Sequence, residues 1–284
     1  MTSTPSTAGR AGLLAACLLA ACCVAGRAWA QADAMFARTI PAYPDLSFPQ
    51  TAGTLGAFSS MSNAIFKPEG DGPFPAVVLV HTCGGLQPHI NDRARDLLAA
   101  GFVVLVLDAY GPRGHRVFCT PAGVGAPRVY KDAFDALAAL EKVKEVDRSR
   151  IYLMGLSLGS FAAAAVSSPG VAQLVGSTRR FRASAGWYGS CAFDVGPFPR
   201  WELVRPDLDR PVLMLLARKD DETPIAPCFP RLDELKAQGK PVAWHVYEDA
   251  THGWDKSNPQ RGYKYSKDVT EDAMRRTIEF FRAN

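Results

Sequence analysis

Residues 151–168 read IYLMGLSLGSFAAAAVSS, and this stretch decides the expected fold. An apolar run predicts a short strand, the pattern G-L-S-L-G follows at residues 155–159, and an alanine-rich run then predicts a helix. A serine on such a turn adopts strained backbone angles and exposes its hydroxyl at the N-terminus of the helix. The stretch therefore predicts a nucleophile at Ser157, the alternative being a serine that only caps the helix.

Short apolar runs alternate with helical patterns outward from this turn. Strands are expected at residues 76–80, 102–107, 151–154, 183–188, 212–217 and 242–247. Helices are expected at residues 91–100, 129–143, 157–168, 230–238 and 271–282. The uninterrupted β-branched runs are typical of strands that are buried on both faces. The alternation predicts the α/β class, a mostly parallel central sheet with helices on both faces, and residues 57–67 are expected to add an antiparallel edge strand.

The composition indicates one large folded domain. The 284 residues are 48% hydrophobic and 21% charged, which excludes a disordered chain and a small disulfide-stapled scaffold. No linker divides residues 31–284, so they are expected to form a single domain, and the short connection between the strands near residues 188 and 212 leaves no room for a large lid domain. The formal net charge of +4 comes without a basic run, which argues against a nucleic-acid partner.

Residues 1–30 contain no acidic side chain and differ from the rest of the chain. Arg10 precedes an uncharged run over residues 11–26, which is shorter than the roughly 20 apolar residues of a membrane-spanning helix. The run leads to Ala28-Trp29-Ala30, the small-x-small pattern that signal peptidase cleaves. The sequence therefore predicts a signal peptide, export to the periplasm or the medium, and no stable membrane span after cleavage.

Two alternatives to a cleaved signal peptide stay open. The segment Leu19-Ala20-Ala21-Cys22 is similar to the box that precedes a lipid-modified cysteine, so Cys22 is a candidate lipid anchor. A short internal core helix is the other alternative.

Removal of residues 1–30 leaves four of the seven cysteines. An even number in an exported chain indicates two disulfides, whereas reduced thiols are expected in the cytosol. The four are Cys83, Cys119, Cys191 and Cys228.

A serine hydroxyl becomes a good nucleophile only when a base accepts its proton and a carboxylate orients that base. On a strand–turn–helix scaffold the chain order is serine, acid, histidine. His252 follows the last predicted strand, at the end of the sheet where such sites assemble, and is the expected base. The alternative for His252 is a solvated loop histidine. The other four histidines lie before Ser157 or inside a predicted strand: His81, His89, His115 and His245.

The acid is expected in the segment KDDETP at residues 219–224, directly after a predicted strand. Asp220 is the first carboxylate after the strand, where the position of the backbone is best defined, and it is therefore the expected acid. Asp221 is the alternative, and both aspartates could instead serve only the turn before Pro224.

An oxyanion hole needs backbone N–H groups that point at the reacting carbonyl oxygen. One is expected from Leu158, and the other from Cys83 in the loop HTCGGL at residues 81–86, where paired glycines give the backbone the required freedom. A nucleophilic Cys83 thiol is the competing interpretation, which is disfavoured because no helix follows at once. Such chemistry needs no metal and no organic cofactor.

Taken together, these segments resemble the dienelactone hydrolase family of α/β-hydrolases from about residue 74 onward. The matching segments are residues 81–86, 108–114, 155–159, 188–191, 220–224 and 250–255. In that family the acid stands four residues before a proline, which also selects Asp220. The namesake enzymes use a cysteine where Ser157 stands, often have a second glycine where Ser160 stands, and lack an export signal. The resemblance therefore implies an α/β-hydrolase fold and a serine esterase rather than a dienelactone-specific enzyme.

The α/β-hydrolase fold that the resemblance implies favours one disulfide pairing, and one arginine is a candidate binding residue. In the usual α/β-hydrolase sheet the first two predicted strands are neighbours, as are the fourth and fifth. Of the three pairings that four cysteines allow, this adjacency favours Cys83–Cys119 and Cys191–Cys228. Arg113 is a candidate to steer an acidic substrate, the alternative being an ordinary surface charge.

The expected activity is cleavage of a small ester, lactone or thioester through an acyl-enzyme on Ser157. The expected partner is therefore a small-molecule substrate. A peptidase or acyltransferase on the same three residues is the alternative enzyme. The alternative from another functional class is a non-catalytic binding protein of the cell envelope that retains the fold.

Overall fold

The computed structural model describes residues 33–34, 37–57, 60–115, 119, 125–193, 201–257 and 262–284. The predicted signal peptide, with the alternative lipid anchor at Cys22, lies outside the described residues. No helix within the described ranges is long and apolar enough to cross a membrane.

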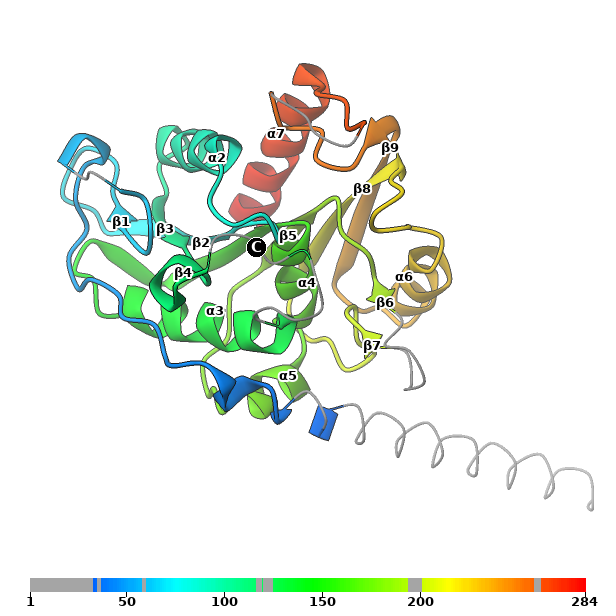
Figure 1. The fold of residues 1–284 in the computed structure, drawn as a ribbon, viewed down its shortest axis with the longest axis horizontal. Helices are drawn as coiled ribbons and strands as arrows, with labels where there is room; N and C mark the ends of the chain where they lie inside the picture. The colour runs from blue at the N-terminus through cyan, green and yellow to red at the C-terminus, as the bar shows by residue number, and fades with distance from the viewer. Residues whose placement is uncertain are drawn as a thin grey trace, which may run out of the picture.

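A seven-stranded sheet forms the centre of the molecule, with the strand order β1-β3-β2-β4-β5-β8-β9 (Figure 1). Its strands are β1 (Ile65–Phe66), β2 (Phe74–Val80), β3 (Val103–Leu107), β4 (Val146–Leu156), β5 (Ser184–Trp187), β8 (Val212–Lys219) and β9 (Val242–Thr251). Strand β1 pairs antiparallel with β3, and every other neighbouring pair is parallel. The predicted α/β class and the antiparallel edge strand are both confirmed, although that strand is only two residues long.

Helices cover both faces of the sheet (Figure 1). One face packs on α2 (Pro88–Ala99) and α7 (Lys267–Ala283). The other packs on α3 (Ala126–Leu140), α4 (Leu158–Ala165), α5 (Pro169–Leu174) and α6 (Cys228–Ala237). Successive side chains of β2 belong alternately to the two hydrophobic cores, so every position of this strand must be apolar.

Helix ends differ from the sequence expectation where a start or stop signal was overlooked. Helix α2 begins at Pro88, because proline suits the first turn of a helix, where its missing N–H costs nothing. The expected helix at residues 157–168 ends early, at Ala165, and a separate helix, α5, begins at Pro169, where the Ser168 side chain caps it by accepting a hydrogen bond from the Val171 N–H. Helix α7 begins four residues early, at Lys267, because Ser266 caps it.

The connection between β5 and β8 contains, within the described residues, two short antiparallel strands, β6 (Ala192–Phe193) and β7 (Trp201–Glu202). Single-turn 3-10 helices, at Ile40–Ala42, Leu55–Ala57 and Gly111–Arg113, complete the described elements. No lid domain therefore stands over the carboxyl ends of the strands in this part of the chain.

Both cysteine pairs favoured by strand adjacency are disulfides in the structure. Cys83 pairs with Cys119 and Cys191 pairs with Cys228, and the Cα atoms of each pair are 4.9 Å apart. The second disulfide is completely buried and joins the segment after β5 to the first residue of α6.

The double variant Cys191→Ser/Cys228→Ser should unfold more easily than the wild type. The disulfide closes a sequence separation of 37 residues, and the chain-entropy model assigns such a closure roughly 3–4 kcal/mol of stability. Denaturant unfolding under oxidising conditions measures the difference. An unchanged midpoint and slope would contradict this stabilising role.

Candidate active site

The turn between β4 and α4 holds Ser157 in a conformation that side chains rarely adopt. Its φ is 53° and its ψ is −109°, and its N–H donates to the carbonyl oxygen of Trp187 at 3.0 Å. A Cβ on Gly155 would lie 1.8 Å from the carbonyl oxygen of Gly159, and one on Gly159 would lie 2.3 Å from that of Val80. Neither glycine can carry a side chain, because the backbones of β4, α4 and the neighbouring strand β2 are in direct contact here.

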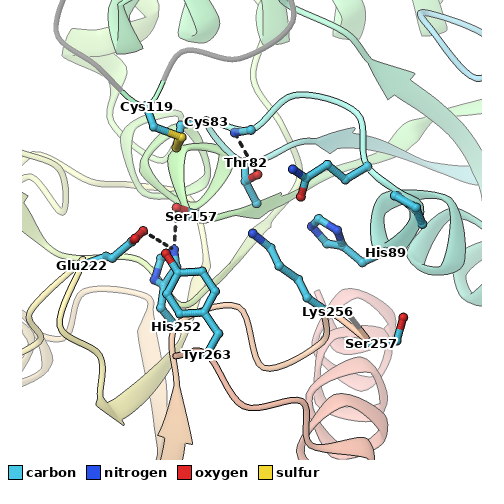
Figure 2. A pocket seen from close by; sticks show the side chains of 13 residues that line it. Thr82, Cys83, His89, Cys119, Ser157, Glu222, His252, Lys256, Ser257 and Tyr263 are labelled. Carbon is cyan, nitrogen blue, oxygen red and sulfur yellow. Dashed lines mark hydrogen bonds and ion pairs between the residues drawn. A yellow bond between two sulfur atoms is a disulfide. The ribbon is translucent and has the colours of Figure 1, made fainter. Parts of the chain in front are cut away.

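His252 lies next to this serine, immediately after β9. Its Nε2 is 3.0 Å from Ser157 Oγ, and its Nδ1 is 2.8 Å from Asp220 Oδ2 (Figure 2 shows the serine and the imidazole). The rings of Tyr188 and Tyr263 pack against the imidazole, with centroids 5.0 and 5.4 Å away. These aromatic and polar contacts hold the ring, which is 2% exposed.

The turn after β8 fixes Asp220 through its own backbone. Asp220 Oδ1 accepts hydrogen bonds from the N–H groups of Glu222 and Thr223, at 3.1 and 2.8 Å. Asp220 Oδ2 lies 2.8 Å from the Thr223 hydroxyl and faces His252. Asp221 is exposed, and the structure records no hydrogen bond between it and His252. The structure therefore brings together Ser157, His252 and Asp220, and not Asp221.

The two expected oxyanion donors lie beside Ser157. Leu158 is the first residue of α4, where a helix leaves the backbone N–H without an intrahelical partner. Cys83 lines the same cavity as Ser157, in a loop that Thr82 closes by accepting from the N–H groups of Gly84 and Gly85. The role of these two N–H groups stays a prediction.

His81, which the chain order excluded as the base, has a structural role. It is fully buried, and burial lowers the pKa of its imidazole. Its Nδ1 is 2.6 Å from the carbonyl oxygen of Thr82, and its Nε2 accepts from the N–H of Ala109 at 3.1 Å. His81 therefore joins the Cys83 loop to the segment that follows β3.

A cavity of about 340 Å³ lies over the serine (Figure 2). Its walls come from the loop after β2, the start of α2, the turn after β8 and the segment after β9. This volume is near the lower end of the range for small-molecule sites. Several lining residues were not assigned to the site from the sequence: Gln87, His89, Glu222, Lys256 and Tyr263. For two of these residues the sequence offered one clue, which was their closeness in the chain to predicted catalytic residues. Glu222 follows Asp220 by two residues and Lys256 follows His252 by four.

The cavity carries both signs of charge. Glu222 Oε2 lies 3.6 Å from His252 Nε2, whereas Lys256 extends from the opposite side, next to His89 (Figure 2). Burial, with smaller contributions from the positive charges of Lys256 and Arg93, lowers the pKa of His89 to about 3. The imidazole of His89 is therefore neutral at physiological pH.

Arg113 does not lie in the cavity, contrary to its expected role in steering an acidic substrate. Its guanidinium forms two hydrogen bonds to Asp132, with Nη1–Oδ2 at 2.7 Å and Nη2–Oδ1 at 2.9 Å. The remaining donors reach the carbonyl oxygens of Pro44 and Ala109. Because its side chain is 1% exposed and its charge is paired, Arg113 stabilises the loop after β3 instead.

A buried polar chain supports the segment that carries His252. The Tyr188 hydroxyl donates to Asp255 Oδ1 at 2.9 Å, and Asp255 Oδ2 is 3.4 Å from Nη1 of Arg93 on α2. Burial raises the pKa of the Asp255 carboxyl, and the Arg93 charge opposes this shift. The chain therefore fixes the segment after β9 against α2. Within the described residues there is no group of three or more side chains suited to hold a metal ion.

Comparison with known proteins gives one family match. The model of the dienelactone hydrolase family matches residues 61–284 of this chain. A relative from Methylorubrum extorquens, provisionally named a carboxymethylenebutenolidase, is 24% identical over 251 residues, which cover 84% of this chain and 80% of that protein.

The solved structures that are similar in fold include two dienelactone hydrolase-like proteins. A provisionally assigned dienelactone hydrolase from Klebsiella pneumoniae superposes with a TM-score of 0.62 at 22% identity, covering 77% of this chain and 91% of that one. The dienelactone hydrolase-like promiscuous phosphotriesterase P91, from metagenomic libraries, gives a TM-score of 0.57 at 20% identity over 75% of this chain and 88% of that one.

Proposed function

Because the chain belongs to the dienelactone hydrolase family, a family of ester- and lactone-cleaving hydrolases, we propose that it is a serine hydrolase. The proposed substrate is a small ester, lactone or thioester, cleaved through an acyl-enzyme on Ser157. One observation supports this most strongly: hydrogen-bond distances of 3.0 and 2.8 Å connect Ser157 to His252 and His252 to Asp220 at the wall of a cavity.

In the proposed mechanism, Ser157 Oγ attacks the carbonyl carbon while His252 Nε2 accepts the hydroxyl proton. Asp220 accepts a hydrogen bond from Nδ1–H, which keeps Nε2 unprotonated in the resting enzyme and stabilises the imidazolium that forms. The N–H groups of Cys83 and Leu158 stabilise the oxyanion. His252 then protonates the leaving group, and a water molecule that His252 deprotonates hydrolyses the acyl-enzyme.

A fluorophosphonate probe tests the nucleophile, and a panel of acyl esters and lactones tests the reaction. The wild-type protein should be labelled at Ser157 and should hydrolyse members of the panel. A purified protein that neither reacts with the probe nor hydrolyses any ester or lactone would favour a non-catalytic binding protein.

We further propose that residues 31–284 form one exported domain and that residues 1–30 are its signal peptide. Two disulfides among the described residues are consistent with an oxidising compartment. The exported protein should begin at Gln31, and intact mass measurement of material from the periplasm or medium checks this. A lipid-modified chain that begins at Cys22 would instead support the anchor.

A further inference from the structure

One turn of the chain places two carboxylates at the two edges of one imidazole. The backbone of this turn is held by Asp220 Oδ1, which accepts the N–H groups of Glu222 and Thr223. Asp220 Oδ2 is thereby 2.8 Å from His252 Nδ1, and Glu222 Oε2 is 3.6 Å from His252 Nε2. The second distance is too long for a hydrogen bond, but it brings a carboxylate close to the atom that carries protons in the proposed reaction.

The leaving group of an ester must lie close to His252 Nε2 during the reaction. After Ser157 Oγ has bonded to the carbonyl carbon, its proton is on His252 Nε2. The carbon–oxygen bond to the leaving alcohol then breaks, and the Nε2 proton moves to that alcohol oxygen. The leaving oxygen must therefore lie within hydrogen-bond reach of Nε2, and so within a few ångströms of Glu222.

We propose that Glu222 determines specificity by selecting the charge of the leaving alcohol, an inference that rests on the proposed serine hydrolase activity. Its carboxylate favours esters whose alcohol part carries a positive charge close to the ester oxygen, such as an amino alcohol. It disfavours alcohols that carry a carboxylate. The Glu222 side chain is 30% exposed and lines the cavity, so it is accessible to a substrate.

Lys256 also lines this cavity and carries a positive charge. It reaches the cavity from the side opposite to Glu222, with His89 behind it (Figure 2). Comparison of Glu222→Gln with the wild type separates the effect of Glu222 from that of Lys256, because the substitution leaves Lys256 in place.

The test uses butyrate esters of choline, of its uncharged carbon isostere and of glycolate, with the full-length processed protein. In the isostere a tert-butyl group replaces the trimethylammonium group, so size is kept and only charge changes. We expect kcat/KM of the wild type to decrease in the order choline, isostere, glycolate. In Glu222→Gln the ratio of choline to isostere should fall about two- to fivefold, the size of an ion-pair effect in a partly exposed site.

Asp221→Asn is the matched control, because it removes the same charge from the neighbouring exposed position. It should keep the wild-type ratio. An unchanged ratio in Glu222→Gln, or an equal fall in both variants, would overturn the role of Glu222. The uncharged ester distinguishes the two proposals, since the wild type must hydrolyse it and Ser157→Ala must not, whatever the charge preference.

Discussion

Ser157→Ala is expected to lower kcat for a reporter ester by about 10⁶-fold, the size of effect measured when the serine of one protease was removed. Without the hydroxyl no acyl-enzyme forms, so neither His252 nor Asp220 can contribute. Only binding and the oxyanion donors remain to accelerate direct attack by water. Steady-state kinetics and loss of fluorophosphonate labelling measure the effect.

Ser160→Ala is the control for this variant. Ser160 is one turn further along α4 and fully buried, and its hydroxyl has no hydrogen-bond partner within the described residues. Its removal should leave labelling and turnover close to those of the wild type. A Ser157→Ala protein that still forms a covalent intermediate would refute the proposed mechanism.

Asp220→Asn is expected to reduce kcat by about 10⁴-fold, the loss seen when the aspartate of a serine protease triad becomes asparagine. The variant keeps an oxygen for the N–H groups of Glu222 and Thr223, so the turn should persist. The amide, however, cannot stabilise the imidazolium, and it favours the wrong tautomer of His252. The pH dependence of kcat and the melting temperature separate this chemical effect from unfolding.

Asp221→Asn should leave kcat within a few-fold of the wild type, because Asp221 is exposed and no hydrogen bond joins it to His252. The two substitutions are chemically identical and affect adjacent residues. The opposite ranking of the two variants would transfer the role of orienting acid to Asp221.

The fold was predictable because its signals are local. The uninterrupted apolar runs at β2 and β3 require a strand buried on both faces, and the observed sheet puts alternate residues into two separate cores. The glycines of the G-x-S-x-G segment predict the turn at Ser157, because the crossing of strand and helix leaves no space for a Cβ. Helix ends were less predictable, since caps such as Ser266 are single residues.

The position of His252 was also predictable, because the carboxyl ends of parallel strands lie at one edge of a sheet. The disulfides follow from the same geometry. Strand β5 lies next to β8 in the sheet, so the segments that carry Cys191 and Cys228 begin at the carboxyl ends of neighbouring strands.

The sequence by itself determined the α/β class, the serine on its strained turn and the end of the sheet where the site forms. Only the tertiary structure decided which aspartate faces His252, that Glu222 reaches its second nitrogen, and that Arg113 is paired with Asp132. The physical reason is the range of the interactions. Strand, turn and helix signals act between residues a few positions apart, whereas these contacts depend on loop paths and on side chains brought together from separate elements of the packed fold.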